Sequence, residues 1–127
     1  MSSSVILDTH VLIWWVQKST RLNAEAIEII ESAPEVYFSA ASVFEIEIKR
    51  PKIPQLPIDL AAEFIKVGFS ELPITSSHAA EVGRQESLLG HDSFDRLLIA
   101  QAEASGLKLV TADGKLTRLA PANTIAI

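Results

Sequence analysis

The chain of 127 residues contains no cysteine, which excludes disulfide bridges and thiolate metal sites. Histidine is also scarce, with three residues in the whole chain, so a zinc site built from several imidazoles is not expected. No apolar run is long enough to span a membrane, because Asp8 and His10 interrupt the run near the N-terminus. The same segment lacks the basic start of a signal peptide, and we therefore expect a cytoplasmic protein without a membrane anchor.

Basic residues are fewer than acidic ones. Lys and Arg total 11 and Asp and Glu total 16, which gives a net charge of −5 at pH 7. Taken alone, this charge argues against a nucleic-acid-binding protein, which usually carries a basic surface. Carboxylates that bind cations would lower the net charge in the same way, so the objection is not decisive. Hydrophobic residues make up 48% of the chain, which suits one well-packed domain over residues 1–127.

Short apolar segments alternate with helix-like segments along the chain. The segments that end at Asp8 and Thr111 have the length and composition of buried strands, and helical periodicity follows or precedes them. Thr9 is expected to cap the first helix, and Ser76 or Ser77 a later one. Strand–helix alternation of this kind predicts an α/β fold with three layers, in which helices cover both faces of a parallel β-sheet.

Two acidic residues come directly after strand-like segments. Asp8 follows residues 4–7, and Asp113 follows residues 108–112. Ligands bind at the carboxyl ends of parallel strands, so both positions are candidates for a functional site. A lone carboxylate within "VILDTHVLIWW" is costly to bury without a partner, which strengthens the case for Asp8. Asp113 with Gly114 also fits a tight turn, and for this pair alone the turn is the more common explanation.

The helix expected over residues 40–50 carries two glutamates on different faces. At about 100° per residue, Glu45 projects from a largely apolar arc, whereas Glu47 lies on the opposite face with Arg50. Glu45 is therefore a candidate site residue and Glu47 a solvated one. A surface ion pair between Glu45 and Lys49, four residues apart, is the alternative explanation.

Asp95 lies near the start of another expected helix, on the same face as Leu98, Ile99 and Ala102. Asp92 could be the N-cap of this helix and Asp95 its third residue, an arrangement that resembles a capping box and requires no function. We interpret Asp92 as the cap and keep Asp95 as a candidate site residue.

Four carboxylates thus project from apolar surroundings at the ends or faces of expected elements. Carboxylates that converge in one place repel and raise one another's pKa, and a hard divalent cation relieves this repulsion. Oxygen ligands without Cys or His favour Mg²⁺ or Mn²⁺. The candidate catalytic and metal-binding residues are Asp8, Glu45, Asp95 and Asp113.

The segments "ILDTHVLIWW", "SAASVFEIEIK", "FDRLLIAQA" and "LVTAD" together resemble the PIN domain, in the branch of VapC-type toxins of toxin–antitoxin systems. The resemblance spans nearly the whole chain in the right order. It implies a hydrolase, an endoribonuclease that uses Mg²⁺ or Mn²⁺ to cleave RNA, with the metal ligands at the same four acids. It also places a supporting hydroxyl at Thr111, and it implies an antitoxin protein as partner and a homodimer.

One motif departs from the family pattern. Relatives often read His-x-Asp-Pro-Phe-Asp-Arg, whereas "GHDSFDR" places His91 directly before Asp92, with Ser93 where proline is usual. The roles of His91 and Asp92 in the site are therefore open, while Asp95 and Arg96 keep their places.

The densest basic cluster is expected to hold the RNA backbone, although a solvated helix end explains each residue singly at least as well. Its members are Lys49, Arg50 and Lys52. The helix after Asp8 also carries two tryptophans. One of Trp14 and Trp15 is expected in the core and the other at an interface, where an antitoxin would cover it while placing an Arg or Lys into the acidic pocket.

Two alternatives without nuclease activity remain. A receiver-like signalling module also binds Mg²⁺ through carboxylates, but it needs a phospho-acceptor Asp after a middle strand, and residues 36–42 contain none. A protein-interaction module with a decayed site is the other, although decay should have removed at least one of the four acids.

Overall fold

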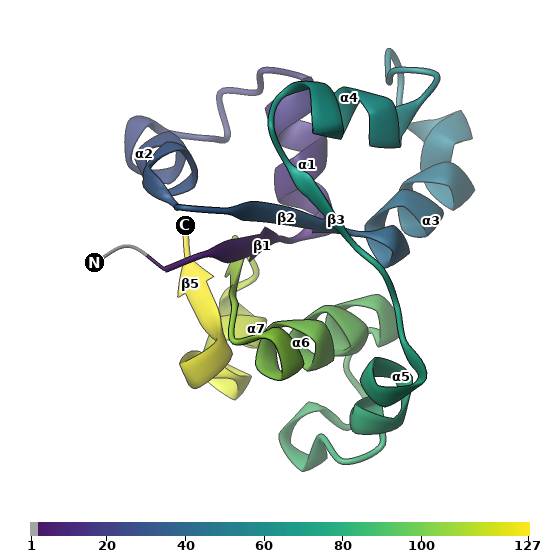
Figure 1. Cartoon of the computed structure of the whole chain (residues 1–127), viewed down its shortest axis with the longest axis vertical. Helices are drawn as coiled ribbons and strands as arrows, with labels where there is room; N and C mark the ends of the chain where they lie inside the picture. Colours follow the sequence, from purple (N-terminus) through teal and green to yellow (C-terminus); the bar gives the residue numbers. More distant parts are fainter. Residues whose placement is uncertain (1–2) are drawn as a thin grey trace.

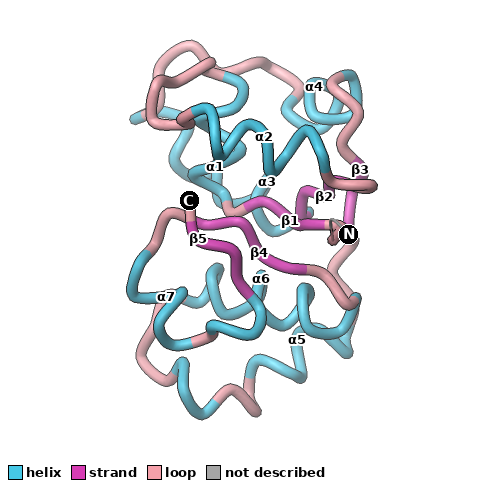
Figure 2. The backbone as a smooth tube through the Cα atoms, turned by 90° about the vertical axis from the view of Figure 1, so that its left-hand side faces the viewer, coloured by secondary structure: helices cyan, strands magenta, loops and turns pink. Residues whose placement is uncertain are grey.

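The computed structural model describes residues 3–127, which form a central sheet between two layers of helices (Figures 1 and 2). The strand order is β3-β2-β1-β4-β5, and every neighbouring pair is parallel. The predicted three-layer α/β fold is therefore confirmed. The strands are β1 (Val5–Leu7), β2 (Val36–Ser39), β3 (Ser70–Leu72), β4 (Lys108–Thr111) and β5 (Thr124–Ala126).

The helices divide between the two faces of the sheet. One face is covered by α1 (Thr9–Val16), α2 (Ala24–Ser32), α3 (Ala40–Lys49) and α4 (Leu60–Lys66). The other face is covered by α5 (Ser76–Val82), α6 (Ser93–Ser105) and α7 (Gly114–Leu119). Short 3₁₀ turns lie at η1 (Arg50–Lys52), η2 (Glu86–Leu88) and η3 (Pro121–Asn123). Within residues 3–127, no helix combines the length and the apolar character that crossing a membrane requires.

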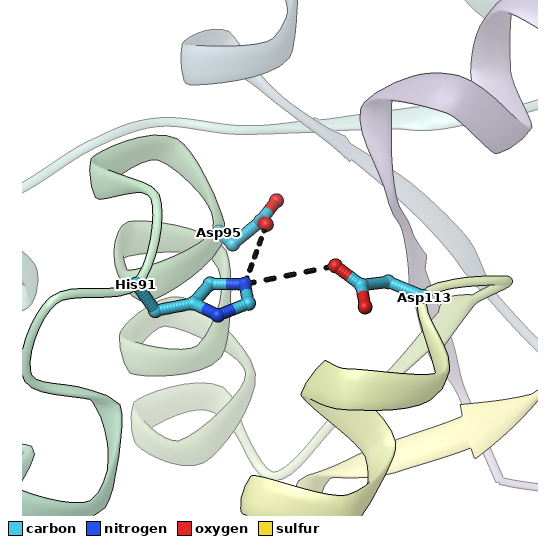
Figure 3. A group of neighbouring side chains, drawn as sticks. All are labelled: His91, Asp95 and Asp113. Carbon is cyan, nitrogen blue, oxygen red and sulfur yellow. Dashed lines mark hydrogen bonds and ion pairs between the residues drawn. The ribbon is translucent and has the colours of Figure 1, made fainter.

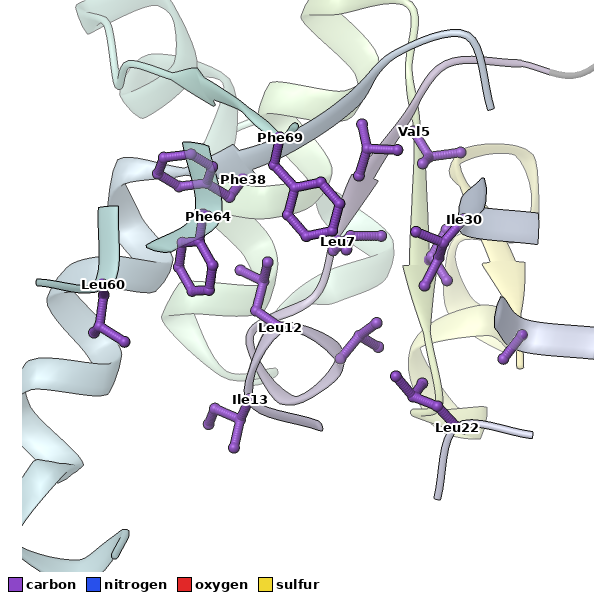
Figure 4. Packing of buried hydrophobic residues seen from close by; sticks show 14 of the residues in the cluster. Val5, Leu7, Leu12, Ile13, Leu22, Ile30, Phe38, Leu60, Phe64 and Phe69 are labelled. Carbon is purple, nitrogen blue, oxygen red and sulfur yellow. The ribbon is translucent and has the colours of Figure 1, made fainter. Parts of the chain in front are cut away.

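The central strands supply side chains to a separate core on each face. Val5 and Leu7 of β1 join the cluster under α1–α4 (Figure 4). Ile6, between them, joins the cluster under α6 and α7. Val110 and Leu109 of β4 divide in the same way. Side chains alternate along a strand, and a parallel sheet with both faces covered buries both sets. This explains why the strand segments read as continuous apolar runs.

The direction in which the chain adds strands to the sheet changes between β1 and β4. The chain builds β2 and β3 on one side of β1 and then returns to place β4 on the other side, paired from Val5↔Lys108 to Leu7↔Val110. The strands that precede Asp8 and Asp113 are therefore neighbours, as expected for a shared site. In open parallel sheets, ligands bind outside the carboxyl ends of the strands at such a reversal.

Two predicted helix caps are wrong. Asp8, not Thr9, holds the cap position of α1, and the Thr9 hydroxyl lies 2.9 Å from Ser42 Oγ, which ties α1 to α3. Thr75 caps α5 in a reciprocal arrangement with His78, one residue before the two serines that the sequence suggested. At α1 the Thr9 hydroxyl is engaged by Ser42 instead, and at α5 the reciprocal hydrogen bonds with His78 favour Thr75 over the adjacent serines.

Candidate active site

The four predicted acids line one cavity of about 450 Å³ at the carboxyl edge of the sheet. Asp8 follows β1 and Asp113 follows β4, whereas Glu45 projects from α3 and Asp95 from the first turn of α6. Two neighbouring strands and a helix from each face of the sheet thus bring together side chains that are far apart in the sequence.

Asp8 is the most enclosed strand-end acid, with 4% of its surface exposed. The Thr111 hydroxyl donates a 2.6 Å hydrogen bond to Asp8 Oδ2 and accepts one of 3.1 Å from the backbone N–H of Asp113. Burial raises the pKa of Asp8, while the Thr111 hydrogen bond partly opposes this shift. Thr111 therefore links the two strand ends and orients the Asp8 carboxylate.

Glu45 satisfies both explanations that the sequence allowed. It is 5% exposed on the buried side of α3, and its Oε2 accepts a 2.7 Å hydrogen bond from Lys49 Nζ, which raises the pKa of Lys49. Its other oxygen, Oε1, is the one buried side-chain polar atom among residues 3–127 that has no hydrogen-bond partner. A buried carboxylate oxygen without a partner is costly, and a divalent cation is a partner that would satisfy it. The donor set therefore fits Mg²⁺ or Mn²⁺.

His91 lies between Asp95 and Asp113, and only 8% of its side chain is exposed (Figure 3). Its Nε2 is 2.9 Å from Asp95 Oδ2 and 3.6 Å from Asp113 Oδ2. One ligand atom from each residue fits within a 4.8 Å span that could hold a metal ion. Burial, followed by the charge of Asp8, raises the pKa of Asp95 to about 6. The sequence motif leaves the role of His91 open, although its place four residues before Asp95 puts both side chains on one side of a helical turn.

Asp92 and Asp113 both cap helices. Asp92 Oδ1 accepts hydrogen bonds from two backbone N–H groups at the start of α6, as predicted. Asp113 Oδ1 does the same for α7, so residues 114–119 form a helix where the sequence suggested a turn. Asp113 divides its two oxygens, because Oδ1 holds the helix while Oδ2 faces His91. The capping role therefore coexists with a place in the site.

The three basic residues predicted to hold RNA have different surroundings. Lys49 lines the acidic cavity, and Lys52 lines a second cavity beside it. The Arg50 guanidinium donates to Glu47 and to backbone carbonyl oxygens of residues 56–58, including a 2.8 Å bond to Pro57 O. These bonds leave Arg50 little freedom to bind a phosphate. Five further residues that line the acidic cavity were not predicted as site residues: His10, Trp14, Arg21, Asp92 and Ala112.

The sequence profile of the PIN domain family matches residues 5–121. The chain belongs to the PIN domain family. Ribonuclease VapC22 of Mycobacterium tuberculosis is 35% identical to it over 121 residues, which cover 90% of each chain. The family resemblance is thereby confirmed, and the receiver-like alternative loses its support.

Solved structures share the PIN fold at lower identity. A toxin–antitoxin complex from Klebsiella pneumoniae has a chain that superimposes with a TM-score of 0.72 at 19% identity, covering 96% of both chains. A chain of VapBC2 from Rickettsia felis, bound to a DNA fragment from their promoter, gives 0.70 at 14% identity, covering 98% of this chain and 97% of the other. At these identities the comparison shows a common fold, with the sheet and helices arranged alike.

Proposed function

We propose that this PIN domain protein is an endoribonuclease that uses Mg²⁺ or Mn²⁺ to hydrolyse RNA phosphodiester bonds, and that it is the toxin of a toxin–antitoxin system. The observation that carries the proposal is the convergence of four carboxylates on one cavity. Ribonuclease VapC22 is similar to this chain over nearly its whole length, and its name supports RNA cleavage as the activity of this cavity. One PIN domain over residues 1–127 and a cytoplasmic location belong to the same proposal.

The metal would be held from two sides of the cavity. Asp8 and Glu45 supply oxygens from the buried side, and Asp95 and Asp113 from the accessible side. When bound, the cation supplies activation of a water molecule and neutralisation of charge at the scissile phosphate. Mg²⁺ and Mn²⁺ suit these oxygen ligands, and the His91 nitrogen favours Mn²⁺ over Mg²⁺.

The remaining side chains hold the acids in position. The Thr111 hydroxyl fixes Asp8 Oδ2, and Lys49 holds Glu45 Oε2 while leaving Oε1 without a protein partner. His91 keeps the Asp95 and Asp113 carboxylates at a fixed separation. Such supporting hydrogen bonds set the orientation of metal ligands and commonly contribute about 10- to 100-fold to metal affinity or activity.

The decisive experiment compares Asp8→Asn with Asp59→Asn. Asp59 caps α4, away from the cavity, and asparagine caps equally well, so this variant is the matched control. We expect the wild-type protein and Asp59→Asn to cleave RNA in Mn²⁺ and to lose cleavage in a chelator. Asp8→Asn should lose cleavage in Mn²⁺ while its metal-free melting temperature stays equal or rises, because burial raises the pKa of this carboxyl.

Two results would contradict the proposal. Wild-type protein that leaves RNA intact in both Mg²⁺ and Mn²⁺ would remove the nuclease assignment. A large fall in the melting temperature of metal-free Asp8→Asn would instead make Asp8 a structural residue.

An antitoxin partner and a homodimer are part of the proposal. Trp14 and Trp15 are both half-buried, and they line an apolar cavity of about 300 Å³ with Leu22 and Ile27 between α1 and α2. This apolar cavity lies next to the acidic one, because Trp14 lines both. An antitoxin that covers the tryptophans could also reach the acids. The test is co-expression with the flanking gene, which should yield a complex without nuclease activity, while light scattering reports whether the free protein is a dimer.

A further inference from the structure

A second cavity, of about 530 Å³, adjoins the acidic one. The two cavities share four lining residues, so they form one groove that begins at the acids and runs along α1 toward η1. The shared residues are His10, Trp14, Arg21 and Lys49. We call the second cavity, away from the acids, the outer groove.

The outer groove differs from the acidic cavity in charge. Its charged lining consists of the cations Arg21, Lys49 and Lys52, and no Asp or Glu is among its described lining residues. The whole chain carries a net charge of −5, so a group of cations without acidic neighbours is not what its average surface would give. A groove that changes from cationic to acidic fits a polyanion whose cleavage point lies at a metal-binding end.

Trp14 lies where the groove joins the acidic cavity. The Arg21 guanidinium is 5.6 Å from the centre of its ring, and the His10 ring is 6.2 Å away. Trp14 is half-buried, whereas Arg21 and His10 are exposed. The indole and the guanidinium that lies over it provide flat surfaces on which a base can stack, and the guanidinium provides a positive charge for the phosphate next to that base.

We propose that the outer groove binds the single-stranded part of an RNA substrate that extends out of the active site; this inference rests on the proposed function. Arg21 and Lys52 contact phosphates, and one base stacks against Trp14 and Arg21. Single strands are required because bases in a duplex are already stacked and do not offer their faces. A basic peptide segment would be repelled by the cations of the outer groove.

The test measures binding without cleavage, using full-length Asp8→Asn protein and a single-stranded oligouridylate of about ten nucleotides in Mg²⁺, a length within the usual range of such sites. Trp14→Leu should weaken binding by roughly tenfold, and Trp14→Phe should restore most of it, because phenylalanine also stacks. Each variant is first checked by its melting temperature. A duplex of the same length should bind more weakly than the single strand.

The salt dependence of the RNA affinity distinguishes cations that contact phosphates from cations elsewhere on the surface. Arg21→Gln and Lys52→Gln should each lower the slope of log affinity against log salt by about 0.7, the value for one phosphate contact with a single strand. Lys66→Gln, which removes an exposed cation on α4, is the matched control and should leave the slope unchanged.

Trp14 fluorescence gives an independent readout. In a Trp15→Phe background, Trp14 is the sole tryptophan, and oligouridylate should quench its emission. In a Trp14→Phe background the same RNA should leave Trp15 emission unchanged, because Trp15 packs against Phe69 at 5.4 Å between ring centres.

Three outcomes would overturn the groove. The first is equal RNA affinity in Trp14→Leu, in Arg21→Gln and in the protein with an unsubstituted groove. The second is tighter binding of the duplex than of the single strand. The third is a set of groove variants that bind RNA normally and lose only the binding of an antitoxin protein. A wild-type protein that binds RNA through Trp14 and Arg21 but cleaves none in Mn²⁺ would instead overturn the proposed function.

Discussion

The two sides of the acidic cavity are built differently. On the inner side, Asp8 and Glu45 are almost fully buried, and Thr111 behind them is completely buried. Each acid there has one oxygen held by a short hydrogen bond, from Thr111 to Asp8 and from Lys49 to Glu45. The low local dielectric at such buried positions strengthens the attraction of a carboxylate for a cation.

The outer side is accessible to water. The Asp113 side chain is 37% exposed and that of Asp95 19%, and both face the ring of His91. Solvent screens their mutual repulsion more strongly than on the inner side. The contrast is one of solvation: the inner acids are desolvated, while water reaches Asp95 and Asp113. We therefore expect substitutions on the inner side to have the larger effects.

The largest expected effect separates two glutamates of one helix. Glu45→Gln removes a buried carboxylate whose Oε1 has no protein partner, so RNA cleavage in Mn²⁺ should fall by at least about 100-fold. Glu47→Gln, two residues along α3, removes an exposed carboxylate paired with Arg50 and should change cleavage by less than about twofold. Initial cleavage rates of the two purified variants provide the measurement, and equal losses in both would contradict the distinction between the faces of α3.

The second-largest expected effect is that metal binding increases the free energy of unfolding. At about 100 times its dissociation constant, a cation that binds only the folded protein stabilises it by about 2.7 kcal/mol. We expect Mn²⁺ to raise the melting temperature of the wild-type protein, and we expect no rise in Asp8→Asn. An equal rise in both proteins would place the ion elsewhere, and calorimetric titration at one pH would give the stoichiometry.

A smaller effect should follow a change at His91. His91→Asn removes a nitrogen ligand and the contact between Asp95 and Asp113, so the affinity for Mn²⁺ should fall by roughly tenfold. The affinity for Mg²⁺ should fall less, because imidazole suits transition metals better than Mg²⁺. Calorimetric titration of the same variant with each ion makes Mg²⁺ the internal control. Identical losses for both ions would indicate that His91 only orients the carboxylates.

The smallest expected effect is on the pH dependence of stability. In the folded protein, burial raises the pKa of Asp8 above its ordinary value of 3.8 and that of Asp95 to about 6. The folded state therefore takes up protons before the unfolded state as the pH falls, so these groups destabilise the metal-free protein at pH 7. The melting temperature of the metal-free protein should therefore increase by a few degrees as the pH is lowered from 7 to 5.

Asp95→Asn is the check on this pH dependence. The variant should show a smaller rise over the same interval, and saturating Mn²⁺ should flatten the wild-type curve, since a cation offsets the same repulsion. A metal-free wild-type protein that loses stability steadily from pH 7 to pH 5 would contradict the raised pKa values.

Local sequence patterns determined the fold class and most of the acids of the site. A strand with both faces buried favours consecutive apolar residues, which is why residues 5–7 and the pair Leu109 and Val110 could be read as parts of a parallel sheet. Asp8 and Asp113 could be recognised because they follow those strands, and Glu45 because it differs from Glu47 in its place around one helix. All of these inferences use neighbours within a few residues.

The sequence was less informative where several local solutions were equally good. Residues 112–119 contain an Asp-Gly pair that suits a turn, but Asp113 caps a helix there because Leu116 can enter the core under α6. Thr75 rather than the adjacent serines caps α5, since His78 completes the reciprocal hydrogen bonds. Burial energy and partner geometry decide between such solutions, and neither is visible in a short window of sequence.

The tertiary structure alone decided which side chains meet. Thr111 and Asp8 are 103 positions apart, and their 2.6 Å hydrogen bond exists because β4 returns to lie beside β1. The same return brings Asp113 to His91, and the packing of α1 against α3 places Trp14 and Lys49 along one groove. Residue types and periodicity act over a few positions, whereas distances between distant segments depend on how the strands are ordered and how the helices cross them.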